Sequence, residues 1–125
     1  RPDGIPSGRV LCYPFARFDE EGNLTYAKAS WKPAADAKEW PRARLWRGLA
    51  CENITQAVAN DLLRHALRRL DNVVLHIHDE IVLEVPEDEA EAAAARLVQI
   101  MCEPPPWASG LPLNAEVAIM ERYGK

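Results

Sequence analysis

The chain has 125 residues, 48% of them hydrophobic, which is enough apolar material for one globular domain over residues 1–125. Its net charge of −4 has the wrong sign for a simple nucleic-acid-binding module, although the chain up to Leu70 is mildly basic. No apolar run reaches membrane-spanning length and no signal peptide opens the chain, so we expect a cytoplasmic protein with no membrane contact. The three cysteines, Cys12, Cys51 and Cys102, lack CxxC spacing, which argues against disulfides or a zinc knuckle and predicts buried thiols.

The first half of the chain predicts a hairpin followed by a helix. Residues 8–13 and 24–28 have the composition of two short strands around a turn at 21–23. Residues 31–46 contain prolines and show no period, so a connecting loop with a helical turn is predicted there. Over residues 49–70 apolar side chains recur every four positions, which predicts a helix packed on a sheet; they are Ile54, Val58, Leu62, Ala66 and Leu70.

Another face of this predicted helix carries Asn53, Gln56, Asn60 and Arg64. A merely solvated helix usually carries Glu and Lys pairs, whereas these amides and this guanidinium donate and accept hydrogen bonds at fixed positions. The face therefore predicts contact with a ligand. The alternative is a row of ordinary surface residues.

The segment VVLHIHDEIVLEV, residues 73–85, places His78, Asp79 and Glu80 between two runs typical of buried strands. Adjacent carboxylates among Val, Leu and Ile are costly unless a cation or a water-filled cleft receives them. An antiparallel hairpin that turns at His78 and Asp79 would place the carboxylates at its tip. A two-residue turn without Gly or Asn should hold backbone strain. The alternative is a solvated turn whose charges only serve solubility.

The last part of the chain predicts a second helix and a closing strand. Residues 88–101 are rich in alanine and predict a helix that buries Leu97, Ile100 and Met101, with exposed acids in its first turn. The segment PPPWASGLP should be irregular, and residues 113–119 alternate as a final strand. The fold class is therefore α+β, an antiparallel sheet with helices packed on one face.

Four elements of the sequence, in order, resemble the palm of family A DNA polymerases, the DNA polymerase I-like family, in its phage-type form. LHIHDEIVLEVP is similar to the motif C hairpin, and ENITQAVANDLL resembles the palm helix that carries a glutamine. IPSGRVLCYP and LPLNAEVAIMERY look like the flanking palm elements. The resemblance covers nearly the whole chain and identifies it with a C-terminal portion of the palm.

The resemblance implies a role for each of these residues. Asp79 would bind a metal ion, Glu80 would support the same site, and His78 would lie against the terminal nucleotide of the primer. Gln56 would donate to minor-groove acceptors of the terminal base pair, which lie at nearly equivalent positions in every Watson–Crick pair. Some family members have asparagine four residues before this glutamine, but Glu52 stands there and Asn53 is displaced by one, which weakens the assignment of a minor-groove role to Asn53.

The resemblance also implies two Mg²⁺ ions, primer–template DNA and a deoxynucleoside triphosphate as partners of the full-length parent. The family's other metal-binding aspartate, in motif A, and its fingers residues have no counterpart here. The chain opens without Met at a point corresponding to the middle of the palm, and so looks like a C-terminal piece of a polymerase. It would need the motif A strand, fingers and thumb from the rest of the polymerase, and alone it should be inactive.

Two other functions remain open at this point. A palm remnant that binds nucleic acid without catalysis would keep the fold and lose the chemistry. A metallohydrolase would use His76, His78 and Asp79, because His76 and His78 would share a face of a strand. The complete HxHxDH pattern fails, since Glu80 and Ile81 stand where its last two residues belong.

Overall fold

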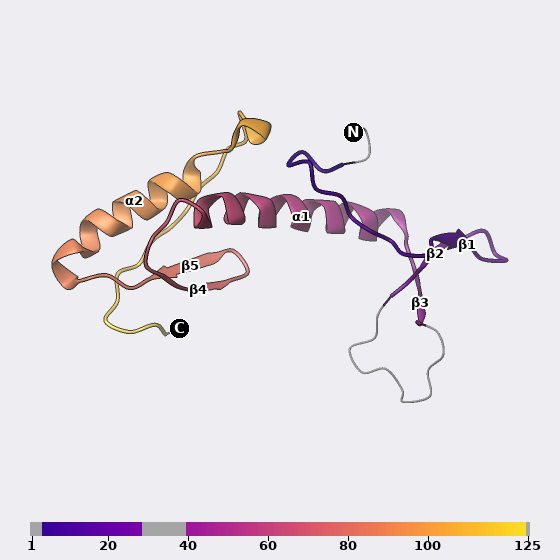
Figure 1. Ribbon diagram of the computed structural model, residues 1–125, viewed down its shortest axis with the longest axis horizontal. Helices are drawn as coiled ribbons and strands as arrows, with labels where there is room; N and C mark the ends of the chain where they lie inside the picture. The colour runs from indigo at the N-terminus through magenta and orange to yellow at the C-terminus, as the bar shows by residue number, and fades with distance from the viewer. Residues whose placement is uncertain (1–3, 29–39, 125) are drawn as a thin grey trace. The chain divides into compact units, whose positions relative to one another are not determined.

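The computed structural model describes residues 4–28 and 40–124. Its contacts divide the chain into two compact units, Arg1–Gln56 and Ala57–Lys125. The helix α1 (Arg47–Leu67) runs across the boundary between them (Figure 1). Each unit contains its own small antiparallel sheet.

The sheet of the first unit has three strands in the order β1 (Arg17–Phe18), β2 (Leu24–Ala27) and β3 (Arg42–Arg44). Both pairings are antiparallel. The β1–β2 turn is closed by Asp19, whose Oδ1 accepts hydrogen bonds from the backbone amides of Glu21 at 3.0 Å and Asn23 at 2.7 Å. Gly22 takes the left-handed conformation there, with φ of 80°.

Two expectations for this unit were wrong. Residues 8–13 form no strand, because Gly8 is left-handed and its amide donates to the carbonyl of Ile5, which bends the chain. The partner of β2 is instead Arg17–Phe18, which the Asp19 turn brings beside it. The expected loop over residues 31–46 contains β3, and its residues 31–39 lie outside the described part of the chain.

Helix α1 begins at Arg47 and ends at Leu67, close to the expected range. Its buried residues are Ala57, Leu63 and Ala66, whereas Ile54 is 47% exposed. A four-residue spacing exceeds the helical repeat, so each step moves about 40° around the axis. The predicted apolar stripe therefore rotates, and its Ala66 end is buried while its Ile54 end is exposed.

The second unit contains the hairpin β4 (Val73–Ile77) and β5 (Glu80–Leu83). The register pairs Ile77 with Glu80, and Val74 is an extra residue in β4. This bulge places Val73 opposite Leu83, on the face where Ile81 is buried, although plain alternation would put Val73 beside Leu75 and Ile77. The hydrophobic core of this unit is formed by Leu63, Ala66, Ile81 and Ile100.

After the hairpin come a single 3₁₀ turn, η1 (Glu87–Glu89), and the helix α2 (Ala90–Cys102). Ile100 is buried and Leu97 and Met101 pack against the core, which confirms the predicted apolar face. Arg69, just after α1, and Glu103, just after α2, form an ion pair of 2.6 Å. A second 3₁₀ turn, η2 (Pro106–Ala108), lies in the proline-rich segment.

The expected final strand over residues 113–119 is not formed. Its side chains alternate in burial only at Leu113 and Ala115, and no neighbouring strand pairs with it in the described part of the chain. A strand needs a partner for its amides and carbonyls, and alternation alone does not provide one.

The α+β class is confirmed, although the strands form two small sheets. Among residues 4–28 and 40–124, no helix is long and apolar enough to cross a bilayer. The cysteines are free, as expected, but Cys12 and Cys51 are exposed and only Cys102 is half-buried, so the expectation of buried thiols was wrong. Cys51 lies on helix α1, which buries other side chains, such as Ala57.

Candidate functional site

The tip of the β4–β5 hairpin is a two-residue turn of His78 and Asp79, as predicted. His78 has a φ of 53°, whereas Asp79 keeps a negative φ. Two-residue hairpin turns need positive φ at their first position, because only then does the turn follow the twist of the strands. Glycine does this without cost, whereas histidine is strained there, although it tolerates this conformation better than most residues. The predicted strain is therefore located at His78.

The three polar residues of the tip differ in how the hairpin holds them. His78 and Asp79 are exposed residues of the turn, and Glu80 is the first residue of β5. Glu80 lies opposite Ile77, on the face of the hairpin that also carries Leu75 and Val82. Asp79 lies between His78, whose φ is strained, and Glu80, which pairs with Ile77. The backbone of Asp79 is therefore held on both sides.

The donor set at the tip is suited to a hard cation but is incomplete. Carboxylate oxygens are the ligands that Mg²⁺ prefers, and Asp79 and Glu80 supply them at an exposed position. Across the described ranges, no group of three or more His, Cys, Asp and Glu side chains is placed to hold a metal ion. Asp79 and Glu80 are suited to supply some of the ligands of a magnesium site, and the other ligands would have to come from elsewhere. The triad His76, His78 and Asp79 does not form such a group, so the metallohydrolase alternative has no support.

The predicted polar face of α1 is present, but its residues are not equivalent. Gln56, Asn60 and Arg64 are exposed, whereas Asn53 is half-buried and its Nδ2 donates to the hydroxyl of Tyr13 at 3.0 Å. Gln56 donates through Nε2 to Glu52 Oε1 at 3.1 Å. Asn53 therefore has a structural role in the first unit, while Glu52 holds the amide of Gln56 on the surface.

The boundary between the two units divides the residues of the polar face of α1. Asn53 and Gln56 lie in the first unit, and Asn60, Arg64 and the hairpin tip lie in the second. Within the second unit, the hairpin packs on α1 through Ile81, Leu63 and Ala66. The structure thus fixes the conformation of each part.

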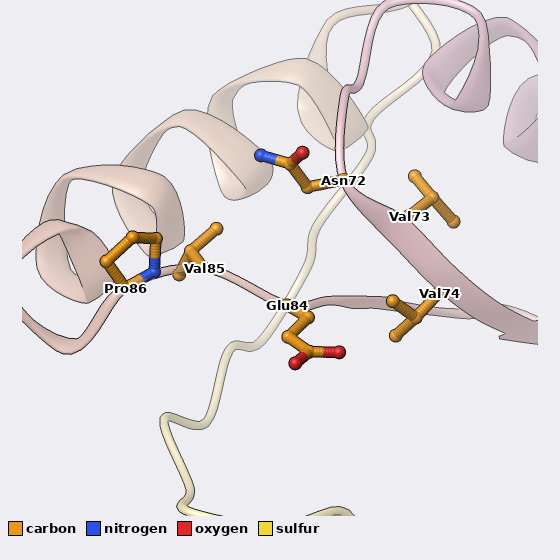
Figure 2. A pocket seen from close by; sticks show the side chains of 6 residues that line it. All are labelled: Asn72, Val73, Val74, Glu84, Val85 and Pro86. Carbon is orange, nitrogen blue, oxygen red and sulfur yellow. The ribbon is translucent and has the colours of Figure 1, made fainter.

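A shallow depression lies at the opposite end of the hairpin from His78 and Asp79. It is lined by Asn72, Val73, Val74, Glu84, Val85 and Pro86 (Figure 2). Figure 2 shows the amide of Asn72 and the carboxylate of Glu84 pointing away from each other, so no polar groups converge on a ligand. The backbone at this end is closed by the amide of Glu84, which donates to the carbonyl of Asn72 at 3.1 Å. We therefore assign the depression to the base of the hairpin and place the candidate site at its tip.

Comparison with known proteins gives a consistent result. A DNA polymerase of Bacillus phage SP02 is 36% identical to the chain over 125 residues, which is 97% of this chain and 19% of the phage protein. Over nearly its whole length, the chain is therefore similar to a segment of a DNA polymerase. Thermostable DNA polymerase I of Thermus filiformis is 38% identical over 72 residues, and that of Thermus thermophilus is 36% identical over 76 residues. These matches cover 51% and 54% of this chain.

The chain spans only a small part of the length of these relatives. It corresponds to 19% of the phage polymerase and to 8% and 9% of the two Thermus enzymes. No family model and no solved structure matches it.

Proposed function

We propose that this chain is the palm segment of a DNA-directed DNA polymerase that presents one share of the catalytic carboxylates at the β4–β5 turn. The observation that carries the proposal is the exposed two-residue turn with Asp79 and Glu80, in a chain similar over 97% of its length to a phage DNA polymerase. The reaction would be template-directed nucleotidyl transfer to the 3′-hydroxyl of a primer.

In this proposal Asp79 binds a magnesium ion directly, because its carboxylate stands in the turn itself. Glu80, which begins β5, supports the same site with a second hard oxygen donor. Bound Mg²⁺, two ions in the full-length parent, would lower the pKa of the attacking hydroxyl and neutralise charge on the leaving pyrophosphate. His78 lies next to Asp79 and would contact the terminal nucleotide of the primer.

The polar face of α1 would contact the DNA. Gln56 would donate to acceptors in the minor groove of the terminal base pair, with Asn60 and Arg64 further along the same exposed face. Asn53 is the weakest member of the group, because it is half-buried and its amide donates to Tyr13, whereas Gln56 is exposed and its amide donates to the exposed Glu52.

The remaining partners follow from the incomplete site. The described residues hold no complete metal site, so the motif A strand, fingers and thumb of the polymerase would supply the other ligands and the triphosphate contacts. Exposed apolar side chains on β4, such as Val74 at 56% and Ile77 at 39%, support a chain that works as part of a larger protein. On this basis, the purified 125-residue chain should not extend a primer above a no-enzyme control.

The decisive experiment is single-turnover primer extension by the complete polypeptide that carries this sequence. Asp79→Asn should slow incorporation at least about a hundredfold, because loss of a direct metal ligand costs several kcal/mol of transition-state stabilisation. Glu80→Gln should have a smaller effect. Asp71→Asn, an exposed carboxylate at the other end of the hairpin, is the matched control and should extend normally. Wild-type rates for Asp79→Asn would refute the catalytic assignment and favour a palm remnant without catalysis.

The polar face has its own measurement. Gln56→Ala should slow extension of matched primer ends, by up to about 1–3 kcal/mol for a lost hydrogen bond in a desolvated site, and slow mismatched ends less. Gln99→Ala on the exposed side of α2 is the matched control. Unchanged discrimination between the two kinds of primer end would remove Gln56 from the DNA contact.

A further inference from the structure

One face of the β1–β3 sheet brings together three arginines from two strands. Thr25 in the central strand lies directly opposite Arg17 on β1 and Arg44 on β3, and residues directly opposite each other point to the same side of a sheet. Arg42 stands two residues before Arg44, so it shares that side. We call these three residues the arginine face; all three are exposed.

Hydrogen bonds to neutral oxygens hold the arginine face in place. Arg42 Nη1 donates to the carbonyl of Phe15 at 2.9 Å, and its Nη2 donates to Thr25 Oγ1 at 2.6 Å. Thr25 Oγ1 in turn donates to the carbonyl of Arg17 at 3.0 Å. None of these acceptors is charged, so the positive charge of Arg42 is fixed in position without being neutralised.

Carboxylates do not cancel this charge within the described residues. The ion pair between Arg69 and Glu103 lies in the second unit, and none is formed by Arg17, Arg42 or Arg44 in the described ranges. The pKa of Asp19 is lowered mainly by the backbone amide of Asn23 and least by the charge of Arg44, and both oxygens of Asp19 already accept hydrogen bonds in the β1–β2 turn. The arginine face therefore carries three positive charges without an ion pair in the described part of the chain, beside a turn that holds Asp19, Glu20 and Glu21, in a chain whose net charge is −4.

Part of the opposite face of the sheet is occupied within the unit. Tyr26 projects to that side, and its ring meets that of Tyr13 edge to face at a centroid distance of 5.1 Å. The hydroxyl of Tyr13 accepts the hydrogen bond from Asn53 of α1. The sheet thus uses its aromatic side to attach to the helix and leaves its arginine side exposed.

A structural role explains part of the arginine face but not all of it. The arginine stems shield Thr25, which is 9% exposed, and Ala27, which is 7% exposed. Arg42 is also needed for its hydrogen bonds to Phe15 and Thr25. Shielding needs only the methylene groups, however, and Arg17 and Arg44 make no side-chain hydrogen bond in the described structure.

We propose that the arginine face is a contact surface for the phosphate backbone of the DNA held by the polymerase. This inference rests on the proposed polymerase function and adds a surface in the first unit that lies outside the polar face of α1. A phosphate is the partner that fits, because guanidinium groups bind phosphate oxygens with paired hydrogen bonds and an anionic polymer can meet several arginines at once. Such a contact does not depend on base sequence, and salt weakens it as counterions compete for the phosphates.

The test compares DNA affinity over a range of salt concentrations in the complete polypeptide that carries this sequence. The double variant Arg17→Gln, Arg44→Gln removes two charges and leaves Arg42 to hold Phe15 and Thr25. The matched control, Arg96→Gln with Arg122→Gln, removes two exposed charges from the second unit. Fluorescence anisotropy with a primer–template duplex gives the dissociation constant, and thermal unfolding checks that every variant is folded.

The arginine-face double variant should bind DNA more weakly than the control. The logarithm of its association constant should also fall less steeply with the logarithm of the salt concentration, with a slope smaller in magnitude by about 1 to 2, since each phosphate contact contributes roughly 0.9. Arg17→Lys with Arg44→Lys should keep most of that slope, because the slope follows charge. An unchanged affinity and slope in the glutamine double variant would overturn the inference.

The same proteins separate this inference from the proposed function. If Asp79→Asn loses incorporation while the glutamine double variant binds DNA like its control, the arginine face is refuted and the polymerase assignment stands. If Asp79→Asn incorporates normally while the double variant loses affinity and slope, the catalytic assignment fails and the phosphate-binding surface stands.

Discussion

The hairpin β4–β5 and the sheet β1–β3 are both small and antiparallel, but different interactions hold them. In the hairpin, Ile81 and Leu83 pack against apolar side chains of α1 and α2. The sheet β1–β3 is organised by polar contacts, namely the Arg42 and Thr25 hydrogen bonds on one side and the Tyr13 hydroxyl on the other. Apolar truncation should therefore damage the hairpin, whereas loss of a hydroxyl or a charge should damage the sheet.

The largest expected effect on stability is at Ile81, which is 8% exposed in the core beneath the candidate site. Ile81→Ala should destabilise the second unit by about 2–5 kcal/mol, because it removes buried methyl groups and leaves a cavity. Amide hydrogen exchange in β4 and β5 measures this. Ile54→Ala, at a residue that is 47% exposed, is the control and should have little effect. Equal protection in the two variants would contradict the assigned core.

A smaller effect is expected at Thr25. Thr25→Val keeps the shape of the side chain but removes the acceptor for Arg42 and the donor to the Arg17 carbonyl, which should cost about 1–2 kcal/mol. The loss should appear as faster amide exchange in β1–β3 and leave the hairpin unchanged. Thr55→Val, which removes only an exposed hydrogen bond to the carbonyl of Cys51, is the matched control. Slower or unchanged exchange in β2 would show that the polar contacts do not organise this sheet.

At His78, in contrast, a substitution should raise the stability of the hairpin. His78→Gly should stabilise the hairpin by up to about 1 kcal/mol, because glycine adopts positive φ without the steric cost of a side chain. The same change should lower the rate of primer extension, since the imidazole next to Asp79 is lost. His76→Gly, within β4, is the contrasting variant and should only destabilise. A less stable hairpin in His78→Gly would mean that the imidazole stabilises the turn by more than the strain costs.

The smallest effect is a pH dependence of the Asp19 turn. Its pKa lies below the ordinary value, mainly because the backbone amide of Asn23 donates to the carboxylate, against an opposing effect of desolvation. The Asn23 side chain, the Glu21 amide and the charge of Arg44 lower it further. The stabilisation is therefore complete above the unfolded-state pKa and is lost as the pH falls through the lowered folded-state pKa.

An NMR titration of Asp19 checks this expectation. Asn23→Ala should retain most of the shift, since the backbone amide remains, whereas a shift abolished in that variant would assign the cause to the side chain. Asp19→Ala should remove the pH dependence of the turn altogether.

The hairpin, both helices and the tip residues could be predicted from the sequence because they depend on local patterns. β-branched runs flank HDE, a helical repeat covers α1, and alanine-rich sequence covers α2. The β1 strand and residues 113–119 were mispredicted because alternation does not show which segments find a pairing partner. Which end of the α1 stripe is buried, and the exposure of Cys51 on α1, depend on which helix face the rest of each unit covers.

By itself the sequence determined the position of the hairpin turn, since three polar residues between apolar strands leave few places for a turn. It also contained the alternation Arg42-Ala43-Arg44, which is typical of a strand but is hidden in a segment rich in prolines. Only the tertiary structure decided that Arg17 joins these arginines across Thr25, because strand register is set by contacts between residues far apart in the chain. In the same way, the bulge at Val74 decided that Val73 joins the hairpin face that meets the core, since one extra residue reverses the side to which the preceding side chain points.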